Sequence, residues 1–162
     1  MKMIVHENPW FSVVRYVGPR GTWFRLKAPD SAIVISEHEG EVIFIRGTRP
    51  FSSSRPSMEL PGGVVEPDET PAQAIERECR EETGYKLAEL KPLGSFKQSA
   101  AVSDSFCHVF HGQIVGEGEA NLDLGEDWSV VKVRKFDIQA VVNKGEIEDA
   151  ATLAALTLWG CV

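Results

Sequence analysis

Residues 63–85 read GVVEPDETPAQAIERECREETGY, an acidic loop followed by a segment with the signals of a helix. Thr70 is a natural N-cap, Pro71 suits the first helical position, and Gln73 completes a capping-box pattern. Gly84 is placed to end the helix, because glycine readily adopts the left-handed conformation of a C-terminal cap. The sequence therefore predicts a helix between these two caps.

The predicted helix carries three carboxylates on one face. At about 100° per residue, Glu78, Glu81 and Glu82 fall on the same side, at spacings of three and four. Beside this face lies an apolar stripe that can pack on a sheet, formed by Ala72, Ile75 and Cys79. A third set points to solvent: Gln73, Glu76 and Arg80. Clustered glutamates repel one another, so they indicate a compensating cation. Oxygen ligands suit Mg²⁺, whereas zinc would want cysteine or histidine.

The residues just before the helix predict a tight approach of the loop to this face. Glu59-Leu60-Pro61-Gly62-Gly63 contains two glycines, which let the backbone turn and bring a carbonyl close to a metal. Arg77 sits beside the carboxylates and can pair with Glu69 and Glu81, because a guanidinium can bridge carboxylates in a fixed geometry. That pairing would hold the loop on the helix.

Across its whole length, the stretch resembles the Nudix box, G-x5-E-x7-R-E-U-x-E-E-x-G-U, where U is apolar. The fixed positions are filled by Gly63, Glu69, Arg77, Glu78, Glu81, Glu82 and Gly84. The U positions hold Cys79 and Tyr85, which are acceptable but are not the usual aliphatic residues. The resemblance implies a pyrophosphohydrolase that uses water to cut a diphosphate bond. It also implies an α/β fold, a Nudix-type α/β/α sandwich with a mixed sheet.

The resemblance carries roles to individual positions. Metal ligands would be Glu78, Glu81, Glu82 and the carbonyl of Gly62. The cofactor would be Mg²⁺, with Mn²⁺ as the alternative. Glu69 and Arg77 would fix the loop. The alternative is a degenerate box that keeps the fold without catalysis, but every acidic position is intact.

The pattern of the rest of the sequence predicts that residues 1–162 form one domain. We expect this domain to contain a mixed sheet covered by helices. Short antiparallel strands are expected within residues 1–30, at 11–16 and 22–26, and this region is a candidate dimer element because of its aromatic residues. Further strands are expected at 31–36, 41–46, 93–98, 106–114 and 129–136, and helices at 138–142 and 148–159.

Looser likenesses outside the box point to the ADP-ribose and nucleoside-diphosphate-sugar pyrophosphatase branch. They lie at residues 8–11, 44–50, 59–63 and 145–150. Candidate substrate-binding residues are Arg49, Arg46, Glu59 and Trp10. Surface ion pairs are the alternative for the two arginines, and core or interface packing is the alternative for Trp10.

Two features of this branch bear on substrate and mechanism. The branch usually has a Pro-Gly pair after the box, where this chain has Ala100-Ala101, which puts ADP-ribose itself in doubt. The branch often draws its general base from an acidic loop, which makes Glu126 the first candidate and Glu81 the second. A solvated loop charge is the alternative reading of Glu126.

Composition and charge limit the kinds of molecule that the protein can be expected to bind. The formal net charge of −7 argues against long nucleic acid. We find no apolar run that could span a membrane and no secretion signal, so we expect a cytoplasmic protein with a small-molecule nucleotide-diphosphate substrate. Three widely spaced cysteines suggest neither a disulfide framework nor a zinc site. We expect a homodimer built through the N-terminal strands.

Three competing functions remain open. A nucleoside triphosphate pyrophosphatase would release pyrophosphate instead of two monophosphates. A ligand-sensing Nudix module often has a broken box or a fused DNA-binding segment, and this chain has neither. A plain acidic interaction domain would show no metal-dependent stabilisation.

Overall fold

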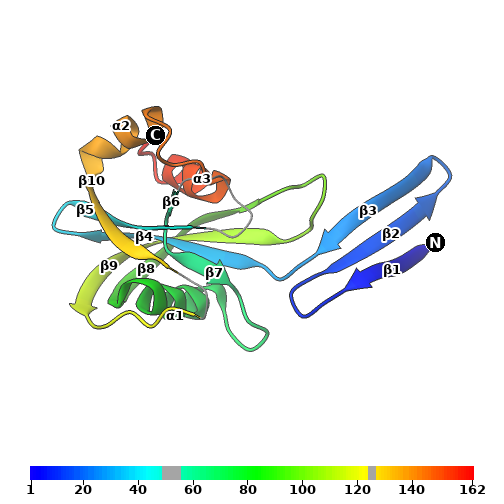
Figure 1. Ribbon diagram of the computed structural model, residues 1–162, viewed down its shortest axis with the longest axis horizontal. Coiled ribbons are helices and arrows are strands. Elements are labelled where there is room, and N and C mark those ends of the chain that lie inside the picture. Colours follow the sequence, from blue (N-terminus) through cyan, green and yellow to red (C-terminus); the bar gives the residue numbers. More distant parts are fainter. Residues whose placement is uncertain (49–55, 124–126) are drawn as a thin grey trace.

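The computed structural model describes residues 1–48, 56–123 and 127–162 (Figure 1). Two residues singled out from the sequence, Arg49 and Glu126, lie outside the described residues. The described residues form an N-terminal three-stranded sheet and a larger sheet flanked by helices.

The N-terminal sheet contains β1 Lys2–Glu7, β2 Ser12–Gly18 and β3 Gly21–Lys27. The larger sheet contains β4 Ser31–His38, β5 Glu41–Gly47, β6 Ser57–Glu59, β7 Gly62–Val64, β8 Tyr85–Lys97, β9 Phe106–Glu117 and β10 Ser129–Arg134. The helices are α1 Pro71–Thr83, α2 Ile138–Asn143, which follows a short 3-10 turn at Lys135–Asp137, and α3 Ala150–Leu158.

The larger sheet is mixed. Its main path runs β10-β5-β4-β9-β8, with β6 paired to β5 and β7 paired to β4. The β4–β9 pair is parallel and the others are antiparallel. The strands expected at 31–36 and 41–46 are present as β4 and β5, which pair as an antiparallel hairpin. Because β7 pairs with β4, the glycine loop is tied to the centre of the sheet just before α1 begins.

Both faces of this sheet are buried. On β4, Ile33 and Ile35 join a core under α2 and α3, while Ala32 and Val34 join a second core under α1. Successive strand residues point to opposite faces, so a strand covered on both sides is apolar throughout. Figure 1 shows α1 on one side of the sheet and α2 and α3 on the other. The expected α/β/α sandwich is confirmed.

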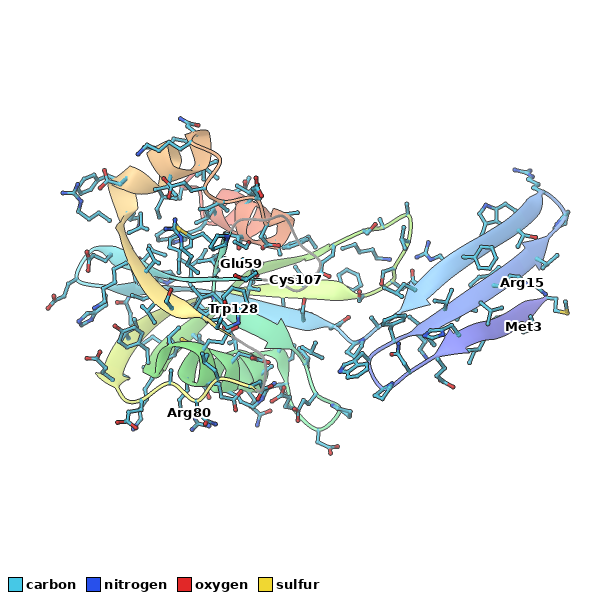
Figure 2. All side chains as sticks on the ribbon, in the orientation of Figure 1. Met3, Arg15, Glu59, Arg80, Cys107 and Trp128 are labelled. Carbon is cyan, nitrogen blue, oxygen red and sulfur yellow. The ribbon has the colours of Figure 1, made fainter. Side chains whose placement is uncertain are left out.

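The N-terminal sheet projects from one end of the sandwich, at the right of Figure 1. The expected antiparallel strands are present as β2 and β3, and the N-terminal ammonium of Met1 donates to the carbonyl of Val17. The sequence reading missed β1, whose residues are all exposed and show no alternation of apolar and polar side chains toward a core. Figure 2 places Met3 and Arg15 on this sheet, away from the sandwich.

β8 is longer than predicted. It starts at Tyr85, directly after the helix cap, and not near Leu93. Three register irregularities interrupt its pairing with β9 between Lys86 and Gly94. The positive φ of Glu89 lies within this stretch. Such breaks disturb the two-residue alternation by which a strand is recognised in sequence.

The α-helices in the described ranges are 13, 6 and 9 residues long, and none is long and apolar enough to cross a bilayer.

Candidate active site

Helix α1 begins and ends where the sequence predicts. The hydroxyl of Thr70 accepts a hydrogen bond from the Gln73 N–H at 3.3 Å, and the Thr70 N–H donates to the Gln73 side chain at 2.8 Å. Gly84 adopts φ 77°, and its N–H donates to the carbonyl of Arg80 at 2.9 Å. These caps satisfy backbone groups that a helix end leaves unpaired, so they fix the register of the carboxylate face.

The opposite faces of α1 separate as expected. Ile75 and Cys79 are fully buried against the sheet, joined by Ala74, while the predicted Ala72 is only partly buried. Figure 2 shows Arg80 on the side of the helix away from the sheet. Burial raises the pKa of the Cys79 thiol to about 11, so this cysteine acts as a core residue.

Arg77 joins the loop and the helix carboxylates. Its guanidinium donates to Glu69 at 2.7 and 3.2 Å, to Glu81 at 3.1 Å and to Glu78 at 2.8 Å. It also donates to the carbonyl of Val64 at 3.1 Å. The predicted pairs with Glu69 and Glu81 are thus confirmed, and Glu78 is an additional partner. Hydrogen bonding by Arg77 lowers the pKa of Glu69, and these carboxylates raise that of Arg77.

The two glycines place the loop directly on the helix. Glu82 is only 4% exposed, and its carboxylate accepts a hydrogen bond from the Gly62 N–H at 2.9 Å. A Cβ atom on Gly63 would lie 2.2 Å from a carboxylate oxygen of Glu78. The sequence signal of two adjacent glycines therefore reflects a close approach that larger residues would prevent.

The donor set fits a hard divalent cation in its chemistry. Glu78, Glu81 and Glu82 offer only oxygen, and they share one helix face beside the loop. Within residues 1–48, 56–123 and 127–162, no three acidic, histidine or cysteine side chains converge closely enough to enclose an ion as they stand. Arg77 engages Glu78 and Glu81, so a bound cation would compete with this guanidinium for both.

A cleft of about 380 Å³ adjoins the loop. Glu59, Gly62 and Gly63 line one part, and Trp10 lines another. Glu59 is only 9% exposed, and Figure 2 labels it within the sandwich. Trp10 is 72% exposed. Its backbone N–H donates a hydrogen bond to the side-chain oxygen of Asn8 at 2.9 Å, and this bond fixes the turn that holds Trp10 at the cleft. Two candidate substrate residues therefore share this cleft.

Arg46 lines a different cavity of about 210 Å³ with Ser57, Gly145 and other residues. Its guanidinium donates to the carboxylate of Glu146 at 2.9 Å. This is the surface ion pair that the sequence left open as an alternative. Arg46 is therefore not among the residues that line the cleft shared by Glu59 and Trp10.

Sequence reasoning missed much of the cleft wall. The missed polar lining residues are Ser31, Gln98, Ser99, Ser103, Ser105 and Asp149. Except for Ser31 and Asp149, they belong to the connection between β8 and β9. The only local signal was the Ala100-Ala101 departure in that connection, which marked the segment but not its side chains.

The sandwich, the acidic helix face and the glycine loop together define an enzyme that acts on phosphorus anhydrides. Residues 26–156 match the NUDIX domain, and the chain belongs to this family of hydrolases, which generally use divalent metals.

Named relatives fit this assignment. The chain is 31% identical over 134 residues to an ADP-ribose pyrophosphatase of Bacillus subtilis (strain 168), covering 81% of this chain and 72% of that protein. It is 29% identical over 160 residues to an ADP-sugar pyrophosphatase of Mus musculus, covering 83% and 72%. A solved ADP compounds hydrolase superposes with a TM-score of 0.82 at 18% identity, covering 99% of this chain and 90% of that one, and has the same fold.

Proposed function

We propose that the protein hydrolyses the diphosphate bond of a nucleoside diphosphate joined to a second group, of the ADP-ribose or nucleoside-diphosphate-sugar type. The products are a nucleoside monophosphate and the phosphorylated second group. The observation that carries the proposal is the cleft that runs from the Gly62-Gly63 loop to Trp10 and residues 98–105. Its volume of about 380 Å³ lies in the usual range of small-molecule sites.

Glu78, Glu81, Glu82 and the carbonyl of Gly62 are our proposed ligands for Mg²⁺, with Mn²⁺ as the alternative. When bound, the metal supplies polarisation of the diphosphate and activation of water. The protein's own contribution is positional. Glu69 and Arg77 hold the loop on α1, and the Gly62 N–H orients the buried Glu82.

The substrate contacts fall to residues along the cleft. Trp10 offers an exposed ring for stacking on a base, and Glu59 offers a carboxylate inside the cleft. Arg46 would have to leave Glu146 to reach a phosphate, and Arg49 is a second candidate cation. For the general base we retain Glu126, with Glu81 as the alternative, because a loop can deliver such a group when substrate is bound.

The decisive assay incubates the protein and Mg²⁺ with ADP-ribose, GDP-sugars, UDP-sugars and nucleoside triphosphates, and separates the products. We expect at least one diphosphate conjugate to give a nucleoside monophosphate and a sugar phosphate. Parallel Glu126→Gln and Glu81→Gln variants assign the base. Efficient pyrophosphate release from triphosphates alone would replace this function by triphosphate clearance, and ligand binding without turnover would favour a sensing module.

We further propose that the protein is a homodimer in which a second copy covers the N-terminal sheet. The support is the exposure of large apolar side chains there: Met3, Ile4, Val5, Val17, Trp23 and Phe24. Exposed apolar strands usually find a partner, because their contact with water is unfavourable.

A further inference from the structure

The connection between β8 and β9, residues 98–105, forms part of the cleft and has several hydrogen bonds of its own. The N–H groups of Val102 and Ser103 both donate to the carbonyl of Ser99, at 2.9 and 2.8 Å. Gln98 donates to the hydroxyl of Ser31 at 3.1 Å. These contacts, together with the hydrogen bonds between Ser103 and Ser105, make a compact turn, which a neighbouring element also fixes from outside.

Arg25, near the end of β3, supplies that fixation. Its guanidinium donates to the carbonyls of Ala100 and Ser103, each at 3.2 Å, and to the carboxylate of Asp104. One side chain therefore forms hydrogen bonds with three residues of the connection. Its planar fork of donors suits several acceptors at once, whereas a lysine would offer a single charged point.

The backbone of β3 adds a further bond. The Leu26 N–H donates to the carbonyl of Val102 at 2.7 Å, and Leu26 forms an isolated parallel bridge with Ser103. Leu26 and Val102 also line the cleft, whereas Arg25 lines a separate cavity beside Trp23. Arg25 consequently contacts the connection on the side away from the cleft, and it can affect the cleft only through the position of the connection.

We infer that Arg25 is a positioning residue for substrate: it couples the N-terminal sheet to the cleft by holding residues 98–105 in a substrate-binding conformation. The inference rests on the proposed function in one respect, that the cleft holds the substrate. It assigns the N-terminal sheet a role in substrate affinity that is separate from any role in dimer formation. The chemical step at α1 does not involve Arg25.

The test compares Arg25→Met with Arg20→Met. Both changes remove one positive charge from the N-terminal sheet and keep an apolar stem, but Arg20 lies exposed in the β2–β3 turn. In Arg25→Met we expect the amides of Val102 and Ser103 to exchange hydrogen about tenfold faster or more. We expect KM to rise about tenfold with kcat changed less than about twofold.

Arg20→Met should match the wild-type protein in both measurements. Arg25→Lys should recover only part of the loss, and Asp104→Asn should shift KM in the same direction by less, because it leaves the two carbonyl contacts of Arg25. Unchanged exchange across residues 71–83 in each variant shows that the sandwich remains folded. These variants make a specific effect on the cleft distinguishable from general unfolding.

Two results would overturn the inference. One is exchange at Val102 and Ser103 that is the same in Arg25→Met and wild type. The other is faster exchange with KM unchanged, or with the loss appearing in kcat. The exchange experiment needs no substrate, so absence of hydrolysis by the wild-type protein would instead overturn the proposed function.

Discussion

Gly62 and Gly63 are neighbours in sequence but meet different surroundings, so an added side chain should have different costs at the two positions. A Cβ on Gly62 would lie 2.4 Å from the backbone carbonyl of Ala32, which is fixed in the sheet. A Cβ on Gly63 would meet the end of the flexible Glu78 side chain. The first contact can be relieved only by moving β4, whereas the second can be relieved by moving a proposed metal ligand.

We therefore expect Gly62→Ala to lower the free energy of unfolding by about 1–3 kcal/mol, as overpacking does. Gly63→Ala should stay close to wild type in stability but lose about tenfold to a hundredfold in kcat, because displaced catalytic groups are costly. Denaturant unfolding and steady-state kinetics on the two variants check this. An unchanged kcat in Gly63→Ala would contradict the proposed role of Glu78.

Residues of the site were predictable where their relation is local. Glu78, Glu81 and Glu82 share a face because helical periodicity depends on spacing alone, and the reach of Arg77 to Glu69 spans only eight residues. The hydrogen bond between Arg25 and Ala100 joins residues 75 positions apart in sequence, and no local pattern predicts it. Long-range contacts of this kind depend on how the two sheets are placed, which a single sequence does not reveal.

The contact between the acidic loop and α1 depends on the ionised form of Glu69. Arg77 lowers the pKa of Glu69 below its ordinary value of 4.5, since its guanidinium favours the carboxylate. A depressed folded-state pKa contributes stability above the unfolded value, and this contribution is lost as the pH falls through the folded value. The loop–helix contact should therefore be stable at neutral pH and weaken in acid below about pH 4.5.

The matching prediction concerns Glu69→Gln. At pH 7 this variant should be less stable than wild type by about 1.5–3 kcal/mol, the usual contribution of hydrogen bonds to charged groups. The difference should shrink as the pH is lowered beneath 4.5, because wild-type Glu69 then becomes protonated as well. Thermal or denaturant unfolding across pH 3–7 measures it. A difference that is constant over that range would show that the charge of Glu69 does not hold the loop.

The elements themselves were predicted with uneven success, for physical reasons. Helix α1 carries both caps in its own sequence, and β4 and β5 are continuous β-branched runs because both faces of the sheet are covered. Register irregularities interrupt the first part of β8, and β6 and β7 are three residues each. Pairing with neighbours, more than residue preference, makes these segments strands.

The N-terminal sheet extends from the sandwich and exposes apolar side chains, including Trp23 at 49% and Phe24 at 56%. We expect light scattering at micromolar concentration to give twice the 17.9 kDa of one chain. Trp23→Ser with Phe24→Ser should shift the mass toward a single chain. Val115→Ser, on β9, should not, although Val115 is even more exposed, at 65%. The mass of one chain for the wild-type protein would contradict the homodimer.

Glu82 lies where the sandwich, the glycine loop and α1 meet. It is buried, and its carboxylate accepts a hydrogen bond from the Gly62 N–H. Glu82→Gln keeps an oxygen that can accept this hydrogen bond but removes the charge. The variant should therefore stay folded while losing the charge that a divalent metal needs. Glu76→Gln, on the exposed face of the same helix, is the matched control.

The most direct measurement is kcat for a hydrolysed diphosphate conjugate in Mg²⁺, for wild type, Glu82→Gln and Glu76→Gln, with and without EDTA. We predict a loss of about a hundredfold or more in Glu82→Gln, because stabilisation of charge by the metal is a large part of such catalysis. Glu76→Gln should remain at the wild-type rate, and EDTA should abolish activity in every protein. Near wild-type turnover in Glu82→Gln, or full activity in EDTA, would contradict metal-dependent hydrolysis at the carboxylate face of α1.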